Sequence, residues 1–276
     1  MQPLVSVDWL SANRAGVIVL DASVTRIDRG AGVTAFAPGP EGFAKAHIPG
    51  ARFADLMGAF SDAQAPFGFT APTLAQLQQA ARAVGISDDS RVVIYDSLGG
   101  AYAARLRYLL RGHGLRDVAV LNGGLQAWKA AGYPVETGMD AAPETGNFTP
   151  VANDGLFTDT AAVLAHVNAP DPSRPLICAL RAPQFDAGHI PHSLNLPYPA
   201  ILDGEGLLDV TLLEKALQDL GLGHDIAPVL YCGGGINAAG LALGFELLGL
   251  ENVVIYDDSM SGWRADPALP IETHDV

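Results

Sequence analysis

The same series of short motifs occurs twice in this chain, at a period of about 140 residues. A His-Ile-Pro motif at His47 returns at His189, and each copy is followed by a helical pattern, an apolar strand and a tryptophan. Asp96 precedes Trp128 by 32 residues, and Cys232 precedes Trp263 by 31. A repeat of this length is too long for a solenoid unit, so the register predicts two homologous domains.

Short apolar runs alternate with helical patterns in both halves. The expected strands are 17–20, 92–95 and 118–121 in the first half, and 176–180, 229–231 and 253–256 in the second. Helices are expected to open at Thr73 and Thr211 and to cover 100–111, 125–131 and 236–248. Strands that alternate with helices indicate an α/β fold, with a mainly parallel sheet flanked by helices in each domain. The predicted boundaries are residues 1–136 and 156–276, with a linker at 137–155 that is rich in Pro, Ala, Gly, Thr, Asn and Asp.

Cys232 stands where the last strand but one ends and a helix begins. Three glycines, Gly233 to Gly235, follow it and allow the backbone to curl tightly. The curled amides can point at the sulfur, and the helix that begins near Ile236 adds free N–H groups and the positive end of its dipole. Both effects stabilise a thiolate, which is the nucleophilic form of cysteine. A buried structural cysteine is the alternative, because that is the commonest state of a free cysteine.

The duplication gives Cys232 a counterpart, because the same strand-end position in the first half holds Asp96. In open parallel sheets ligands bind at the carboxyl ends of the strands, so both positions are candidate pockets. Only the second half carries a nucleophile there. We therefore expect the first domain to be catalytically inert.

Composition excludes several classes of partner and location. A net charge of −14 argues against nucleic acid or an anionic membrane as the main partner. The two cysteines, Cys178 and Cys232, do not form a secreted disulfide framework or a Cys/His metal pattern, so we expect no metal and no organic cofactor. The first residues lack a signal-peptide pattern, and no apolar run has the length of a membrane span. The expected location is the cytoplasm.

Taken together, these motifs resemble the two-domain sulfurtransferases of the rhodanese and 3-mercaptopyruvate sulfurtransferase family. The resemblance rests on the paired His-Ile-Pro motifs, on Ala103-Ala104-Arg105, on Asn122-Gly-Gly-x-x-x-Trp128 and on Trp263 with its following Pro-Ile-Glu. It covers nearly the whole chain. It implies two tandem rhodanese-like domains, an active cysteine in the second, and a persulfide on Cys232 as the covalent intermediate.

The resemblance also implies the chemistry. A small anionic donor gives its outer sulfur to Cys232, and a thiophilic acceptor such as cyanide or a thiol then removes it. The backbone amides of the loop hold the persulfide charge; the loop residues are Gly233, Gly234, Gly235, Ile236 and Asn237. In thiosulfate-using members the cysteine loop resembles Cys-Arg-Lys-Gly-Val-Thr, which has two cations, whereas the loop of this chain has none. We therefore expect 3-mercaptopyruvate to be favoured over thiosulfate as the donor. The loop of mercaptopyruvate-using members resembles Cys-Gly-Ser-Gly-Val-Thr, and Gly234 and Asn237 replace its serine and threonine in this chain.

Several other residues have a functional and a structural interpretation. Arg181 follows a strand near Cys232 and is expected to hold the anionic part of the donor; in the family an Asp-x-Arg sequence stands here, and we read Ala179-Leu180-Arg181 as its counterpart. The resemblance implies that His47 faces the cleft between the domains, where it could bind substrate or move a proton. His189 repeats the motif, which favours a structural role for both histidines. Cys178 lies inside an apolar strand and is expected to be inert.

Other functions remain open at this stage. A cysteine phosphatase or arsenate reductase also presents a thiolate in a cradle of amides, but needs an arginine a few residues later to clamp the oxyanion. Residues 233–243 contain no arginine or lysine. A non-catalytic binding module on the same fold is the third possibility, because a fold does not guarantee a function.

Overall fold

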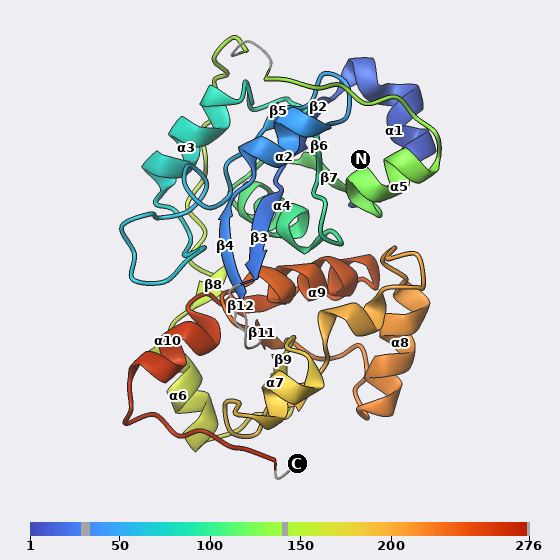
Figure 1. Ribbon diagram of the computed structural model, residues 1–276. Coiled ribbons are helices and arrows are strands. Elements are labelled where there is room, and N and C mark those ends of the chain that lie inside the picture. Colours follow the sequence, from blue (N-terminus) through green and yellow to red (C-terminus); the bar gives the residue numbers. More distant parts are fainter. Residues whose placement is uncertain (29–33, 140–142, 275–276) are drawn as a thin grey trace. The chain divides into compact units, whose positions relative to one another are not determined.

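The computed structural model describes residues 1–28, 34–139 and 143–274 of the chain. The chain divides into two compact units, Met1–Ala152 and Asn153–Val276, which run from blue to yellow-green and from yellow-green to red in Figure 1. No helix within these described ranges is long and apolar enough to cross a bilayer.

The first unit is built on a five-stranded parallel sheet. Its strands, in the spatial order β1-β7-β6-β2-β5, are β1 (Leu4–Val5), β7 (Asp117–Leu121), β6 (Arg91–Tyr95), β2 (Ile18–Asp21) and β5 (Arg52–Phe53). The sheet is flanked by α1 (Val7–Asn13), a 3-10 turn (Arg14–Gly16), α2 (Pro40–Lys45), α3 (Leu74–Ala83), α4 (Ala101–Gly112) and α5 (Gly124–Ala130). Thr73 caps α3 as predicted, and forms a capping box with Gln76.

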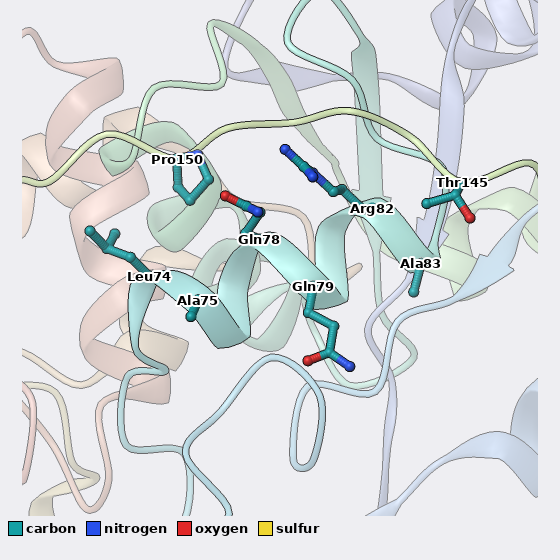
Figure 2. A pocket seen from close by; sticks show the side chains of 8 residues that line it. All are labelled: Leu74, Ala75, Gln78, Gln79, Arg82, Ala83, Thr145 and Pro150. Carbon is teal, nitrogen blue, oxygen red and sulfur yellow. The ribbon is translucent and has the colours of Figure 1, made fainter.

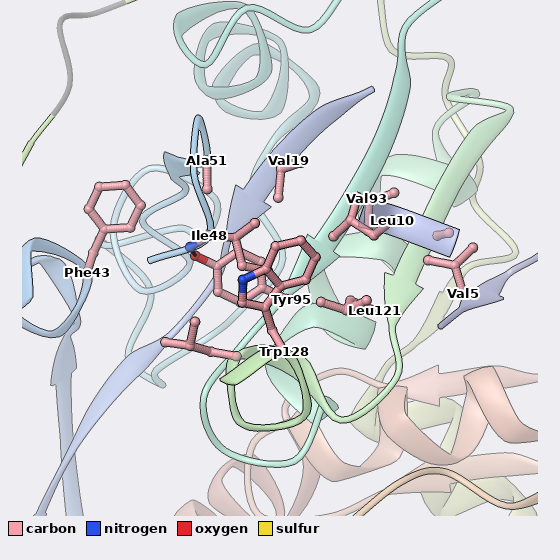
Figure 3. Close-up of a cluster of buried hydrophobic side chains, with 12 residues drawn as sticks. Val5, Leu10, Val19, Phe43, Ile48, Ala51, Val93, Tyr95, Leu121 and Trp128 are labelled. Atoms are coloured by element: carbon pink, nitrogen blue, oxygen red, sulfur yellow. Dashed lines mark hydrogen bonds between the residues drawn. The ribbon is translucent and has the colours of Figure 1, made fainter. Parts of the chain in front are cut away.

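One part of the core of the first unit lies between one face of the sheet and the helices α1, α2 and α5. Leu10, Phe43 and Trp128 from these helices pack against strand residues such as Val93 and Tyr95 (Figure 3). The Tyr95 hydroxyl accepts a hydrogen bond from the Ile48 amide at 3.2 Å, so the polar end of this buried ring is satisfied. The helix α4 contacts β6 and β7, and it follows the loop that begins at Asp96.

The second unit repeats this architecture. Its parallel strands, in the order β10-β9-β11-β12-β8, are β10 (Leu194–Asn195), β9 (Leu176–Cys178), β11 (Val229–Tyr231), β12 (Val254–Tyr256) and β8 (Phe157–Thr158). The helices are α6 (Thr160–Asn168), α7 (Ala182–Asp186), a 3-10 turn (Tyr198–Ile201), α8 (Val210–Asp219), α9 (Ile236–Leu247) and α10 (Ser259–Ala265). The two sheets share one strand order, which confirms the predicted α/β fold with mainly parallel sheets.

One element of the first unit has no counterpart in the second. The sequence predicts only a loop after the first strand, whereas the structure has an antiparallel ribbon of β3 (Val24–Asp28) and β4 (Thr34–Pro38). Four of the five β3 residues are exposed, so no buried face imposes an alternating pattern on the sequence. That prediction was wrong for this segment. In the second unit β9 is followed directly by the short helix α7.

Residues 143–152, which belong to the predicted linker, are bound to the first unit. The Phe148 side chain is buried, its amide donates to the Ile86 carbonyl at 3.1 Å, and the Arg82 Nε donates to the Phe148 carbonyl at 2.8 Å. Figure 2 shows Arg82 beneath this segment, in a groove that also exposes Thr145 and Pro150. Residues 143–152 therefore pack on the first unit and do not form a free linker. Residues 140–142 of the predicted linker lie outside the described ranges.

Candidate active site

Cys232 follows β11, which lies between β9 and β12 in the sheet of the second unit. Cys232 is 3% exposed. The loop from Gly233 leads into α9, whose N-cap residue Gly235 has φ 78°. This left-handed conformation is accessible to glycine without steric cost. The structure thus has the predicted arrangement of strand, cysteine, glycine turn and helix.

The amides of the five residues after Cys232 have no hydrogen-bond partner among the described residues; these are Gly233, Gly234, Gly235, Ile236 and Asn237. An α-helix leaves its first N–H groups without intrahelical acceptors, and the curled loop adds further ones. Successive free amides form a concave site for an anion. The loop can therefore supply hydrogen bonds to a negative sulfur without rearranging other contacts.

The corresponding loop of the first unit already holds a carboxyl group. The carboxyl group of Asp96 accepts hydrogen bonds from the amides of Leu98 at 2.7 Å, Gly100 at 3.0 Å and Ala103 at 2.9 Å. Gly100 caps α4 with φ 89°, as Gly235 caps α9. Burial raises the pKa of Asp96, and the three amides oppose that shift. The first-unit loop is thus filled by its own side chain.

The start of α10 contacts the cysteine loop from the side. The Cys232 amide donates to the Ser259 Oγ at 3.2 Å, and the Cys232 carbonyl accepts from the Met260 amide at 3.0 Å. The sequence patterns did not reveal Ser259 as a contact of Cys232. The signal that could have found it is its place four residues before Trp263, where the first half has Gly124 four residues before Trp128.

A groove of about 410 Å³ opens beside the loop within the second unit. Its lining includes Gly233 from the loop and Ser261 and Arg264 from α10; the remaining lining residues are Leu180, Pro183, Gln184, Ala187 and Met260. The Arg264 Nη2 donates to the Gly188 carbonyl at 2.8 Å. The loop therefore has an adjoining space with one cation at its wall.

The profile of the rhodanese-like domain matches this chain twice, at residues 10–131 and 161–266. The chain belongs to the rhodanese-like family. The duplication inferred from the motifs, the predicted family and the tandem rhodanese-like domains are thereby confirmed. The matched ranges contain Asp96 and Cys232 respectively.

Relatives of this rhodanese-like chain are sulfurtransferases, which confirms the predicted enzyme class. It is 33% identical to thiosulfate/3-mercaptopyruvate sulfurtransferase 2 of Arabidopsis thaliana, over 98% of this chain and 86% of the relative. It is 30% identical to the 3-mercaptopyruvate sulfurtransferase of Escherichia coli K12, over 82% and 83%, and 30% identical to the thiosulfate sulfurtransferase of Rattus norvegicus, over 96% and 93%. The crystal structure of SseA from Escherichia coli superposes with a TM-score of 0.83 at 26% identity, over 94% of this chain and 99% of that one.

Cys178 is the second cysteine of this rhodanese-like chain, and it is fully buried in the core of the second unit. Burial raises the pKa of its thiol to about 11, so the thiol stays protonated at neutral pH. Cys178 pairs with Tyr231 in the sheet, as Asp21 pairs with Tyr95 in the first unit. The register therefore places Cys178 at the strand-end position that holds Asp21 in the first unit.

Arg181 lies at the N-cap of α7, with an exposed side chain that makes no capping hydrogen bond. It stands on the segment that follows β9, the neighbour of β11, so it belongs to the same edge of the sheet as Cys232. Arg181 does not line the groove beside Gly233, whereas Arg264 does. Its assignment to the donor remains a prediction.

His47 and His189 occupy matching structural positions. Each ring stacks on a phenylalanine four residues earlier, and each Nδ1 lies 2.9 Å from that residue's carbonyl oxygen. Backbone bridges join His47 to Glu136 and His189 to Glu272. Each histidine thereby joins the segment after a short helix to a distant segment of its own unit. This shared geometry favours the structural alternative for both, and a role of His47 in catalysis remains a prediction.

Clusters of three or more His, Cys, Asp or Glu side chains that could hold a metal ion are absent from residues 1–28, 34–139 and 143–274.

Proposed function

We propose that this rhodanese-like enzyme moves a sulfane sulfur from 3-mercaptopyruvate to a thiophilic acceptor through a persulfide on Cys232. The observation that carries the proposal is the row of five unpaired amides after Cys232. The first-unit loop supports it, because three amides there hold the carboxyl group of Asp96. Amides aimed at a developing negative charge stabilise it strongly in a buried site.

The cycle has two covalent steps, and Cys232 makes and breaks both bonds. Its thiolate attacks the sulfur of 3-mercaptopyruvate, the carbon–sulfur bond breaks, and the electron pair leaves with the enolate of pyruvate, which takes up a proton. The outer sulfur of the persulfide then carries the negative charge that the loop amides bind. An acceptor thiolate or cyanide attacks this outer sulfur and returns the Cys232 thiolate. The proposed cycle requires no metal and no organic cofactor.

The choice of donor rests on charge. Thiosulfate is a dianion, and the loop from Gly233 to Asn237 carries no cation to meet it. 3-Mercaptopyruvate has a single carboxylate, for which one arginine suffices. We assign that contact to Arg181 at the same edge of the sheet as Cys232. The alternative donor is thiosulfate, with the same mechanism and sulfite as the leaving group.

The first unit is proposed to be catalytically inert. The position of Cys232 is held there by Asp96, whose own carboxyl group occupies the loop amides. A carboxylate cannot carry a sulfane sulfur through this cycle. The proposal therefore assigns all transfer to the second unit.

Initial rates with both donors test this proposal. Wild type is expected to show a higher kcat/KM with 3-mercaptopyruvate than with thiosulfate, and Cys232→Ser is expected to lose transfer from both while remaining folded. Cys178→Ala is the matched control and is expected to keep its activity. Transfer that persists in Cys232→Ser would overturn the mechanism. A clear preference for thiosulfate would overturn the donor assignment alone.

A further inference from the structure

Ser259 has a backbone conformation that residues with a side chain rarely adopt. It is fully buried, and its φ of 51° lies in the left-handed region. A non-glycine residue there is strained, and such strain persists only where the surrounding structure holds it in place. The first unit uses glycine at the corresponding position, Gly124, with φ 56°. The second unit therefore keeps the conformation but adds a hydroxyl group.

The Ser259 hydroxyl group both donates and accepts a hydrogen bond. The Ser259 Oγ donates to the Tyr256 carbonyl at 2.9 Å and accepts from the Cys232 amide at 3.2 Å. A serine hydroxyl has one donor, so its hydrogen bond to Tyr256 leaves the oxygen lone pairs to face Cys232. Gly124 can make neither contact in the first unit. The added hydroxyl thus reaches Cys232, the proposed nucleophile, whose counterpart in the first unit is Asp96.

The peptide group before Cys232 is held from both sides. The Tyr231 carbonyl accepts from the Ala179 amide at 2.8 Å, and the Cys232 amide donates to Ser259. A trans peptide is planar, with its carbonyl and its N–H pointing in opposite directions. Two bonds at opposite ends therefore fix the plane from which the Cys232 side chain projects.

The next two peptide groups are held by the residues after Ser259. Met260 donates its amide to the Cys232 carbonyl at 3.0 Å, and Ser261 donates its amide at 3.0 Å and its hydroxyl at 2.7 Å to the Gly233 carbonyl. These carbonyls point at α10, so the N–H groups of the same planes, on Gly233 and Gly234, point away from it. Both N–H groups belong to the unpaired row after Cys232.

We propose that Ser259 is a positioning residue for Cys232, whose strained backbone and buried hydroxyl group orient the cysteine peptide so that the loop amides face the sulfur. This inference rests on the proposed persulfide mechanism. It assigns Ser259 no contact with donor or acceptor. It explains why the second unit retains a serine where the first has glycine.

Two substitutions separate positioning from structural support. Ser259→Gly and Ser259→Ala both remove the hydroxyl group, but only alanine keeps a Cβ at the left-handed position. Ser259→Ala is therefore expected to unfold at a lower urea concentration than Ser259→Gly. The rate of persulfide formation in a single turnover is expected to fall on the order of tenfold in both, as for one lost hydrogen bond, and the KM for donor should change little.

Thr160→Val is the matched control, because it removes a different hydroxyl of the second unit, which lies 2.7 Å from the Tyr256 hydroxyl. It is expected to lower stability and leave the rate of persulfide formation unchanged. Wild-type rates in Ser259→Gly, or rates that follow stability across all three variants, would overturn the positioning role. Wild type that forms no persulfide would overturn the proposed function itself, which distinguishes the two failures.

Discussion

Asp96 and Cys232 stand at the same position in the two units, each directly after the middle strand of a five-stranded parallel sheet. The carboxyl group of Asp96 occupies the amides of its loop, whereas the amides after Cys232 have no partner among the described residues. In the first unit the loop amides thus bind a permanent carboxyl group, and we propose that the loop amides of the second unit bind a transient persulfide in the same way.

Removing the Asp96 carboxyl group is expected to destabilise the first unit. Asp96→Ala leaves three amides without their acceptor, and a buried unsatisfied donor costs about 1–3 kcal/mol. We expect a loss of at least about 2 kcal/mol in the free energy of unfolding from urea titration. Persulfide should still form on Cys232 in the folded variant. Unchanged stability would contradict the account of this loop.

The two thiols are expected to differ in reactivity. Because burial raises the pKa of Cys178 to about 11, only about one Cys178 thiol in a thousand is ionised at pH 8. Iodoacetamide at pH 8 should therefore label Cys232 and spare Cys178 in the folded protein, and label both in urea. Peptide mass spectrometry reads the result. Faster labelling of Cys178 than of Cys232 in the folded chain would reverse the assignment.

Two arginines, Arg181 and Arg264, can be compared as binding residues for the carboxylate of 3-mercaptopyruvate. Arg181→Ala is expected to raise the KM for 3-mercaptopyruvate on the order of tenfold with little change in kcat, as for loss of one charge-assisted contact. Arg264→Ala is the matched comparison and is expected to have a smaller effect, since this guanidinium is bonded to the Gly188 carbonyl. The opposite ranking would move the carboxylate site into the groove beside Gly233.

Asp21 makes the stability of the first unit depend on pH. Burial raises the pKa of this carboxyl group in the folded state above its usual 3.8. Below that value both states are protonated; as pH rises the unfolded chain ionises first, so stability is lost through the raised folded pKa. Asp21→Asn keeps an acceptor for the Ser23 amide, which donates to the Asp21 Oδ1 at 2.8 Å.

The Asp21→Asn variant should therefore be more stable than wild type at pH 7 and nearly equal to it at pH 3. Urea titrations at both pH values measure the difference. An equal effect of the substitution at the two pH values would show that the Asp21 carboxyl group is not the source of the pH dependence.

The sequence was sufficient for the fold and for the position of the cysteine, because both depend on local signals. Apolar runs mark buried strands, and three glycines after Cys232 mark the turn into α9. The duplicated order of motifs then predicted two units of one architecture, whereas the strand order and the two-residue strands β1, β5, β8 and β10 are seen only in the structure. Thr73 as a helix cap is equally local.

The features that the sequence did not show depend on pairing between distant segments. Ser259 is 27 residues from Cys232, and only the fold reveals that its hydroxyl reaches the cysteine amide. The register that aligns Cys178 with Asp21 requires the sheet itself. Residues 143–152 were predicted as part of a linker because the segment is rich in Pro, Ala, Gly, Thr, Asn and Asp, yet their backbone is bonded to α3 and the residues after it.

Cys232 is proposed to carry the sulfur in transit, and mass spectrometry detects that sulfur between the two steps of the cycle. After incubation with 3-mercaptopyruvate and without acceptor, the peptide that contains Cys232 should gain about 32 Da, the mass of one sulfur atom. Cyanide or a thiol should then remove that mass. A gain on Cys178 instead, or turnover with no added sulfur on Cys232 at any time, would contradict the account.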